Sequence, residues 1–138
     1  LTQASSLIGR QVETGSAAAG LSATSNATWN WSAPRDVASM TATITDANGR
    51  VVETRSIPAG ATSGTMNWDG STSAGKTMGA GTYTLALKGI DAAGNEVAVT
   101  PHATGQVSDV QLVNGNVQVK INGMTVNASE LVRVGTNG

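Results

Sequence analysis

Apolar and polar residues alternate with a period of two along most of the chain, which is the pattern of half-buried β-strands. In "MTATIT" (40–45) Met40, Ala42 and Ile44 alternate with threonines. The same alternation recurs in "TYTLAL" (82–87), "VAVT" (97–100) and "NVQVKI" (116–121). No long apolar pattern of period 3.6 appears, and only "ASEL" (128–131) is expected to hold a helical turn. The pattern therefore predicts an all-β protein.

Turn signals separate these predicted strands. "DANGR" (46–50), "DAAGNE" (91–96) and the "NG" pairs at 114–115 and 122–123 predict hairpins, because tight hairpin turns need positive φ angles. "SAPRD" (32–36) contains a proline and predicts a loop. About ten short strands at this spacing indicate a sandwich or a small barrel.

The strands divide into two groups. Residues 21–102 hold all three tryptophans and the longer connections, and they predict a β-sandwich. Residues 103–138 form a tight valine-rich meander, shorter than the roughly 40 residues that an unstapled domain usually needs. We therefore expect this meander to combine with residues 1–20, where "SSLIGRQVETG" (5–15) is strand-like, into a discontinuous small barrel. The sandwich would be inserted between the two ends.

Composition removes several classes of function. The net charge is −1, only 12% of residues are charged and no Lys/Arg cluster exists, which argues against nucleic-acid binding. The absence of cysteine excludes disulfides, thiolate catalysis and cysteine-based zinc sites. No apolar run approaches the roughly 20 residues that span a bilayer. Because the chain begins at Leu1 rather than Met, we expect it to be part of a longer product.

"GSTSAGKT" (70–77) matches the phosphate-binding pattern G-x-x-x-x-G-K-[ST] letter by letter. A phosphate loop also needs a buried strand before it and a helix after it, whose N-terminus faces the anion. Here Gly79 and Gly81 disfavour a helix, and an alternating strand follows. We predict a turn-rich crossing between "MNWDG" (66–70) and "TYTLAL", no nucleotide, and a core anchored by Trp68 and Tyr83.

The remaining candidate sites have simpler explanations. The loops that begin at Asp46 and Asp91 lack the acidic twelfth residue of a helix–loop–helix calcium site, so turns explain them better. His102 is the single histidine, and with no partner motif it is predicted to be a surface polar residue. The nine carboxylates are scattered and give no reason to propose an acid–base pair. We therefore predict no enzyme, metal or cofactor.

Trp29 and Trp31 lie two residues apart, so both rings point to the same face of a strand. Burial in the sandwich is the favoured interpretation. The alternative is an outward face on which the pair contacts another protein, since aromatic residues are enriched at interface hot spots.

One longer stretch carries a family resemblance. "NWDGSTSAGKTMGAGTYTLAL" (67–87) resembles the W-D-G…G…G-x-Y signature of immunoglobulin-like domains in the bacterial flagellar hook-capping (FlgD) family. "SSLIGRQV" (5–12) and the segment 105–134 resemble the opening and closing segments of that family's core, in the same order. The signature positions are Trp68, Asp69, Gly70, Gly75, Gly81 and Tyr83. We expect Gly81 to occupy a turn position with positive φ.

The resemblance implies a fold and a function. The fold would be a fibronectin-III-like sandwich (21–102) inserted into a tudor-like, SH3-like barrel (1–20 plus 103–138), as a core fragment without the family's N-terminal region. The function would be a non-enzymatic scaffold at the distal tip of the growing hook, exported through the flagellar type III pathway. Its partners would be hook-protein subunits and further copies of itself, with no nucleic acid, nucleotide or membrane.

A second interpretation stays open. The W-D-G signature also suits an immunoglobulin-like adhesion or carbohydrate-associated module of a secreted bacterial protein. Such a module has no need of the two barrel-forming ends, so "SSLIGRQV" and "ELVRV" (130–134) favour the hook cap.

Overall fold

The structure is a computed structural model that describes residues 5–137, with the backbone alone at 136 and 137. The described residues form ten β-strands and one 3₁₀ helix, and no helix among them is long and apolar enough to cross a membrane. The elements are β1 (Arg10–Thr14), β2 (Ala18–Leu21), β3 (Ala27–Thr45), β4 (Val51–Trp68), β5 (Gly81–Ile90), β6 (Glu96–Ala98), β7 (Thr100–Val113), β8 (Asn116–Ile121), β9 (Met124–Asn127), η1 (Ala128–Glu130) and β10 (Leu131–Asn137).

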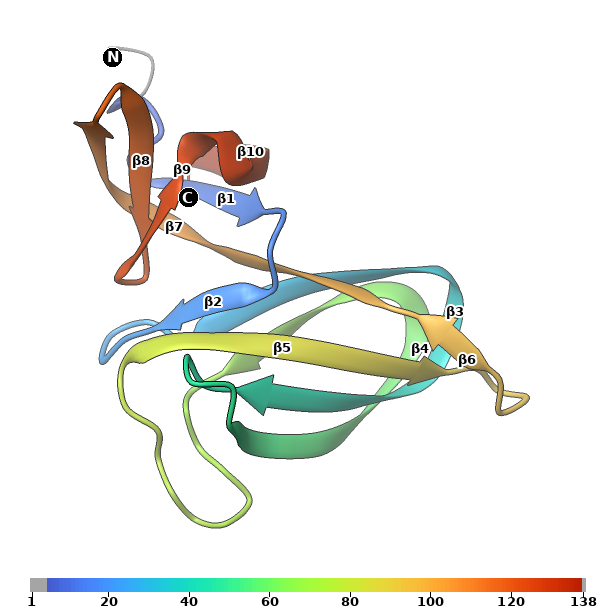
Figure 1. The fold of residues 1–138 in the computed structure, drawn as a ribbon. Helices are drawn as coiled ribbons and strands as arrows, with labels where there is room; N and C mark the ends of the chain where they lie inside the picture. The colour runs from blue at the N-terminus through green and yellow to red at the C-terminus, as the bar shows by residue number, and fades with distance from the viewer. Residues whose placement is uncertain (1–4, 138) are drawn as a thin grey trace.

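A long, bent hairpin of β3 and β4 gives the larger part its two layers (Figure 1). The first part of β3 pairs with β4 on one side and with β7 on the other. The second part of β3 pairs again with β4 but now with β5, which also carries β2 and β6. We call β2–β6 together with the first half of β7 the central sandwich. Three-stranded pairing of β4, β3 and β7 forms its first layer, and β5 with its neighbours forms the second.

The core of the central sandwich follows from the alternation of the sequence. Trp29 and Trp68 are fully buried between the layers together with Ile44 and Leu85. A second cluster gathers around Trp31, whose ring lies on the backbone of Gly64. A Cβ on Gly64 would be 2.8 Å from that ring, so glycine is what allows the close approach.

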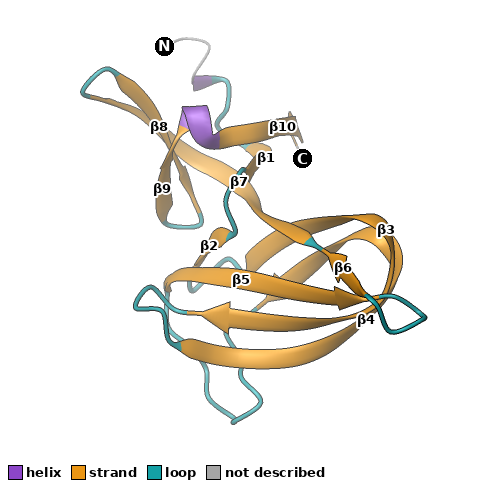
Figure 2. Ribbon diagram, turned by 45° about the vertical axis from the view of Figure 1, so that its right-hand side comes forward, coloured by secondary structure: helices purple, strands orange, loops and turns teal. Residues whose placement is uncertain are grey.

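The two ends of the chain meet in a smaller part, which we call the terminal module (Figure 2). It consists of β1, β8, β9, β10 and the second half of β7, paired in the order β10-β1-β7-β8-β9. Its buried residues are Val12, Val107, Val119 and Ile121. The pairings found among residues 5–137 do not close this sheet, so a tudor-like barrel stays a prediction, as do the boundaries 1–20 plus 103–138 and 21–102. Residues 1–4 and 138 of those ranges lie outside the described residues.

Strand β7 runs from the central sandwich into the terminal module, and a close backbone contact joins the two beside it. The β8–β9 turn sits against Gly20 and Gly105: Cβ atoms there would be 2.6 Å from the Asn122 carbonyl oxygen and 2.4 Å from Ile121 Cγ2. Asn122 Nδ2 also donates to the carbonyl oxygens of Gly20 and Asn26, at 3.3 and 3.1 Å. Gly20 and Gly105 therefore allow the close approach of the two parts, and Asn122 hydrogen-bonds across it.

Most predicted turns are confirmed, and three predictions are wrong in detail. The four hairpin signals each join two strands, and "ASEL" contains the 3₁₀ turn η1. The predicted loop "SAPRD" instead lies inside β3, where the register with β4 shifts between Ser32 and Val37, so that Pro34 needs no ladder hydrogen bond. The strand in "SSLIGRQVETG" begins only at Arg10, after a helical turn. Three strands are long rather than short: β3, β4 and β7.

Candidate interaction groove and signature loop

The stretch that matches a phosphate loop forms a tight turn between two strands. Ser71 and Thr77 pair across it, the Thr72 amide donates to the Lys76 carbonyl at 2.9 Å, and Gly75 has a φ of +82°. Lys76 is exposed, and the chain enters β5 at Gly81 rather than a helix. The geometry lacks the helix N-terminus that a nucleotide phosphate requires.

This turn binds an anion of the chain itself, the carboxylate of Glu53. The amide and hydroxyl of Ser73 donate to Glu53 Oε1 at 3.0 and 2.7 Å, and Arg55 donates twice to Oε2 at 3.0 and 2.6 Å. The backbone N–H of Ser73, its hydroxyl and the Arg55 guanidinium lower the pKa of Glu53 to about 2. No local pattern in the sequence predicts this site, because Ser73 lies 20 residues from Glu53.

The aromatic residues of the signature, Trp68 and Tyr83, are buried in the sandwich core beside the turn. The rings of Trp68 and Tyr83 meet edge to face, with centroids 4.8 Å apart. Trp68 Nε1 donates to the Ser71 carbonyl at 2.8 Å, and the Tyr83 hydroxyl donates to the Gly79 carbonyl at 2.7 Å. The second bond is the geometry of a tyrosine corner, in which a hydroxyl reaches back along its own chain. Burial raises the pKa of Tyr83.

The small residues of the signature shape the chain between these rings. Asp69 accepts the Ser71 amide and hydroxyl at 3.0 and 2.7 Å, which lowers its pKa. Gly70 has a φ of +94°, and a Cβ there would be 3.0 Å from the Met78 carbonyl oxygen. Gly81 does not have the predicted positive φ, because it already lies in β5 and pairs with Leu21. Within the described residues, the side chains of the signature therefore bond to this turn and to the sandwich core.

The two predicted turn loops are turns in the structure as well. Asp46 Oδ1 accepts the amides of Asn48 and Arg50 at 2.9 Å each, and Asp91 Oδ1 accepts those of Ala93 and Asn95 at 2.9 and 2.8 Å. Arg35 pairs with the other oxygen of Asp91. Within residues 5–137 no group of three or more His, Cys, Asp or Glu side chains is placed to hold a metal ion.

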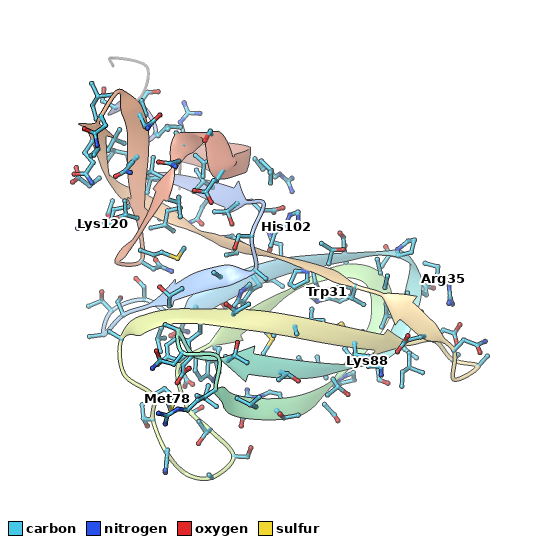
Figure 3. All side chains as sticks on the ribbon, viewed as in Figure 1. Trp31, Arg35, Met78, Lys88, His102 and Lys120 are labelled. Carbon is cyan, nitrogen blue, oxygen red and sulfur yellow. The ribbon has the colours of Figure 1, made fainter. Side chains whose placement is uncertain are left out.

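His102 does have a partner, contrary to the sequence-based expectation. It is half-buried where the terminal module meets the sandwich (Figure 3), and its Nδ1 lies 3.0 Å from Glu13 Oε2. Asn30 Nδ2 donates to the other carboxylate oxygen of Glu13 at 3.0 Å. Burial raises the pKa of Glu13, but the hydrogen bonds from Asn30 and His102 outweigh it and leave the pKa below its ordinary value. Three strands thus meet at one carboxylate.

Around this cluster the outer face of the first sandwich layer is entirely polar. Trp29 and Trp31 point inward, 0% and 7% exposed, so the residues between and beside them point outward. Strand register places nine side chains in a three-by-three grid, which we call the polar floor: Ser63, Ser32 and Thr100; Thr65, Asn30 and His102; Asn67, Thr28 and Thr104. Within it Thr28 donates to Asn67 at 2.7 Å and Thr65 donates to Asn30 at 2.9 Å.

The polar floor is the bottom of a groove, and the terminal module is its wall. Three adjoining hollows of about 390, 270 and 410 Å³ cover the floor. The first two share Glu13, Asn30 and Arg133, and the last two share Gln11 and Thr104. We call this continuous depression the interaction groove. Both rings are buried, as the favoured interpretation predicted, so Trp29 and Trp31 do not form the outward face that the alternative of a protein contact needs.

Comparison with known families decides what this architecture is. The family model of the "FlgD Ig-like domain" matches residues 15–93, more than half of the chain. The chain belongs to the FlgD family. FlgD proteins are non-enzymatic hook-capping scaffolds of the bacterial flagellum, and the immunoglobulin-like domain of the family corresponds here to β2–β5 with the signature loop.

Solved FlgD structures match nearly the whole chain. FlgD from Xanthomonas campestris, whose structure was described with insights into the hook capping essential for flagellar assembly, is 27% identical with a TM-score of 0.81; the match covers 96% of this chain and 97% of that one. FlgD from Pseudomonas aeruginosa gives 21% identity and a TM-score of 0.69, covering 94% and 98%. Truncated FlgD from Helicobacter pylori has 18% sequence identity and a TM-score of 0.54, and the match covers 96% of each chain; it shares the fold. A comparison with curated protein sequences found no match.

Proposed function

We propose that this chain caps the growing flagellar hook as a scaffold and promotes the assembly of exported hook-protein subunits. The observation that carries the proposal is the similarity to Xanthomonas FlgD over 96% of the chain, which includes the terminal module as well as the immunoglobulin-like part. The protein would act at the distal tip of the hook, outside the cell, after export through the flagellar type III pathway. It would contact hook subunits and, in the full-length protein, further copies of itself.

The surface of the molecule suits this task. A cap must hold each subunit long enough for it to join the tube and must then let go, which favours polar, shallow contacts over a deep apolar pocket. Most of the side chains that line the interaction groove carry hydroxyl or amide groups. A pair of units with a tudor-like barrel and a fibronectin-III-like sandwich would present such a surface at their junction.

The rival function is an adhesion or carbohydrate-associated module. It explains the sandwich and its signature loop but gives no role to the terminal module. Here β1 pairs with β10 and β7, and Asn122 ties the β8–β9 turn to β2 and the following loop. That close union of the ends with the sandwich supports the hook cap.

Immunogold electron microscopy of the source cells, with antibody against this chain, tests the proposal. We expect label at the tips of short, unfinished hooks and its absence from completed ones. Label spread over the cell envelope or the medium would instead favour the surface module.

A further inference from the structure

The interaction groove contains one charged side chain whose hydrogen-bond donors the described part of the fold leaves unengaged. Of the residues that line its three hollows, only Glu13, His102 and Arg133 carry titratable groups. Both oxygens of Glu13 are already engaged by Asn30 and His102. Arg133 is exposed and lies opposite Glu13 in the β1–β10 ladder, where its charge helps to lower the pKa of Glu13. Within residues 5–137, however, its guanidinium donates no hydrogen bond and forms no ion pair. The groove therefore offers a free guanidinium.

The polar floor beneath Arg133 has the repeat of an extended polypeptide. Outward side chains on one strand recur roughly every 7 Å, the same spacing that separates alternate side chains of any extended chain. Each hydroxyl or amide on the floor can donate as well as accept a hydrogen bond. The three rows of the floor span about 14 Å along β3, enough for three outward side chains of a guest strand.

We propose that the interaction groove binds an extended segment of a hook subunit, rich in Ser, Thr, Asn or Gln, with an acidic side chain that pairs with Arg133. This inference rests on the proposed function, since it names the part of the molecule that holds the subunit. The polar floor hydrogen-bonds the segment, and a guanidinium pairs with a carboxylate in two-pronged geometry. The free cation at the groove wall selects an acidic segment over a basic one.

Two pairs of variants test the site. Arg133→Glu reverses the free charge, and Arg50→Glu is its control, because Arg50 is also exposed but lies in the β3–β4 turn. Ser32→Tyr fills the floor with a neutral ring. Thr41→Tyr adds the same ring to an exposed position of the same strand in the other layer. Circular dichroism melting checks that each variant folds.

The probe is the monomeric hook protein of the same bacterium, titrated into the ¹⁵N-labelled full chain by NMR. We expect amide shifts on the polar floor, at Asn30, Thr65 and Thr104, and a Kd about tenfold weaker for Arg133→Glu and for Ser32→Tyr. The two controls should bind like the wild type, and salt should weaken the wild type more than Arg133→Glu.

The outcomes separate the two proposals. If the wild type binds hook protein and both groove variants bind equally well, the groove inference is overturned while the capping function stands. If the wild type does not bind at all, both fail. If the groove amides shift with the concentration of this chain alone, the groove is a contact between copies and the inference is also overturned.

Discussion

The central sandwich and the terminal module are both antiparallel, yet their cores are built from different material. The sandwich buries three tryptophans and a tyrosine, and Trp29 and Trp68 are almost completely enclosed. The terminal module buries Val12, Val107, Val119 and Ile121 and no aromatic residue among those described. An aromatic side chain buries about 150–250 Å², so the sandwich gains far more from each enclosed residue.

This difference has a consequence for stability. The strands of the sandwich lie in one continuous stretch of the chain. The terminal module is built from β1 and β10, which lie at opposite ends of the chain, and from half of β7. Local unfolding starts where few apolar contacts hold an element. We therefore expect the terminal module to open first and the sandwich to set the stability of the whole chain.

Trp68→Ala should have the largest effect, and it tests whether the aromatic core stabilises the sandwich. Removing the ring leaves a cavity, deprives Tyr83 of its edge-to-face neighbour and removes the indole donor of the Ser71 carbonyl, which keeps the Arg55 guanidinium as a donor. We expect the free energy of unfolding, measured with urea, to fall by about 3–5 kcal/mol. Trp68→Phe keeps much of the volume and should lose less. Equal losses for the two variants would show that packing of the large ring is not what stabilises the sandwich.

Ile121→Ala applies the same challenge to the terminal module. We expect the free energy of opening this module to fall by about 2–5 kcal/mol, because the residue belongs to its small core. Hydrogen exchange followed by mass spectrometry should show faster exchange in β1, β8 and β10 while β3 and β5 stay protected. Uniformly faster exchange across all strands would mean that the two parts unfold as one unit.

Gly20→Ala tests the join between the parts. The added Cβ would lie 2.6 Å from the Asn122 carbonyl oxygen, so the β8–β9 turn must move away. We expect the free energy of unfolding to fall by about 1–3 kcal/mol and the radius of gyration, measured by small-angle scattering, to increase. Gly79→Ala is the matched control, because nothing lies within 4 Å of its Cβ position. A Gly20 variant as compact and stable as this control would show that the turn is not docked there.

The smallest effect should appear in acid and concerns the Glu53 carboxylate of the sandwich. The pKa of Glu53 is about 2 in the fold, against an ordinary value of 4.5, so its carboxylate contributes stability that is fully present above pH 4.5. That contribution is lost as the pH falls from about 4.5 toward 2. Melting temperatures of the wild type should therefore decline over this window, and Glu53→Gln should decline less steeply. If the melting temperatures of the two proteins decline equally with pH, Glu53 does not contribute this stability.

Local patterns predicted much of the fold. The alternation around Trp29 and Trp31 favoured the burial of both rings, which the structure confirms. The same alternation indicates the polar floor, because Thr28, Asn30 and Ser32 are the intervening positions. The prediction of a turn-rich crossing after Gly70 followed from Gly79 and Gly81 and from a strand where a phosphate loop needs a helix. These predictions succeeded because each depends on residues within one strand or one turn.

Contacts between distant segments could not be predicted from the sequence. His102 and Glu13 are 89 residues apart, and Glu53 and Ser73 are 20 residues apart, with no spacing rule that links either pair. Gly81 belongs to the family signature, but its φ depends on where β5 begins to pair with β2. The groove itself combines hollows lined by residues from both ends and the middle of the chain.

The sequence by itself determined that the chain is all-β, where its hairpins turn, which faces of its strands are apolar and that its signature resembles the FlgD family, because side-chain alternation and turn chemistry are local properties. Only the tertiary structure decided that Glu53 fills the signature loop, that Glu13 meets His102 and that Arg133 is left unpaired above a polar floor. The physical reason is that a charge is satisfied or free according to its neighbours in space, and strand pairing chooses those neighbours from far along the chain.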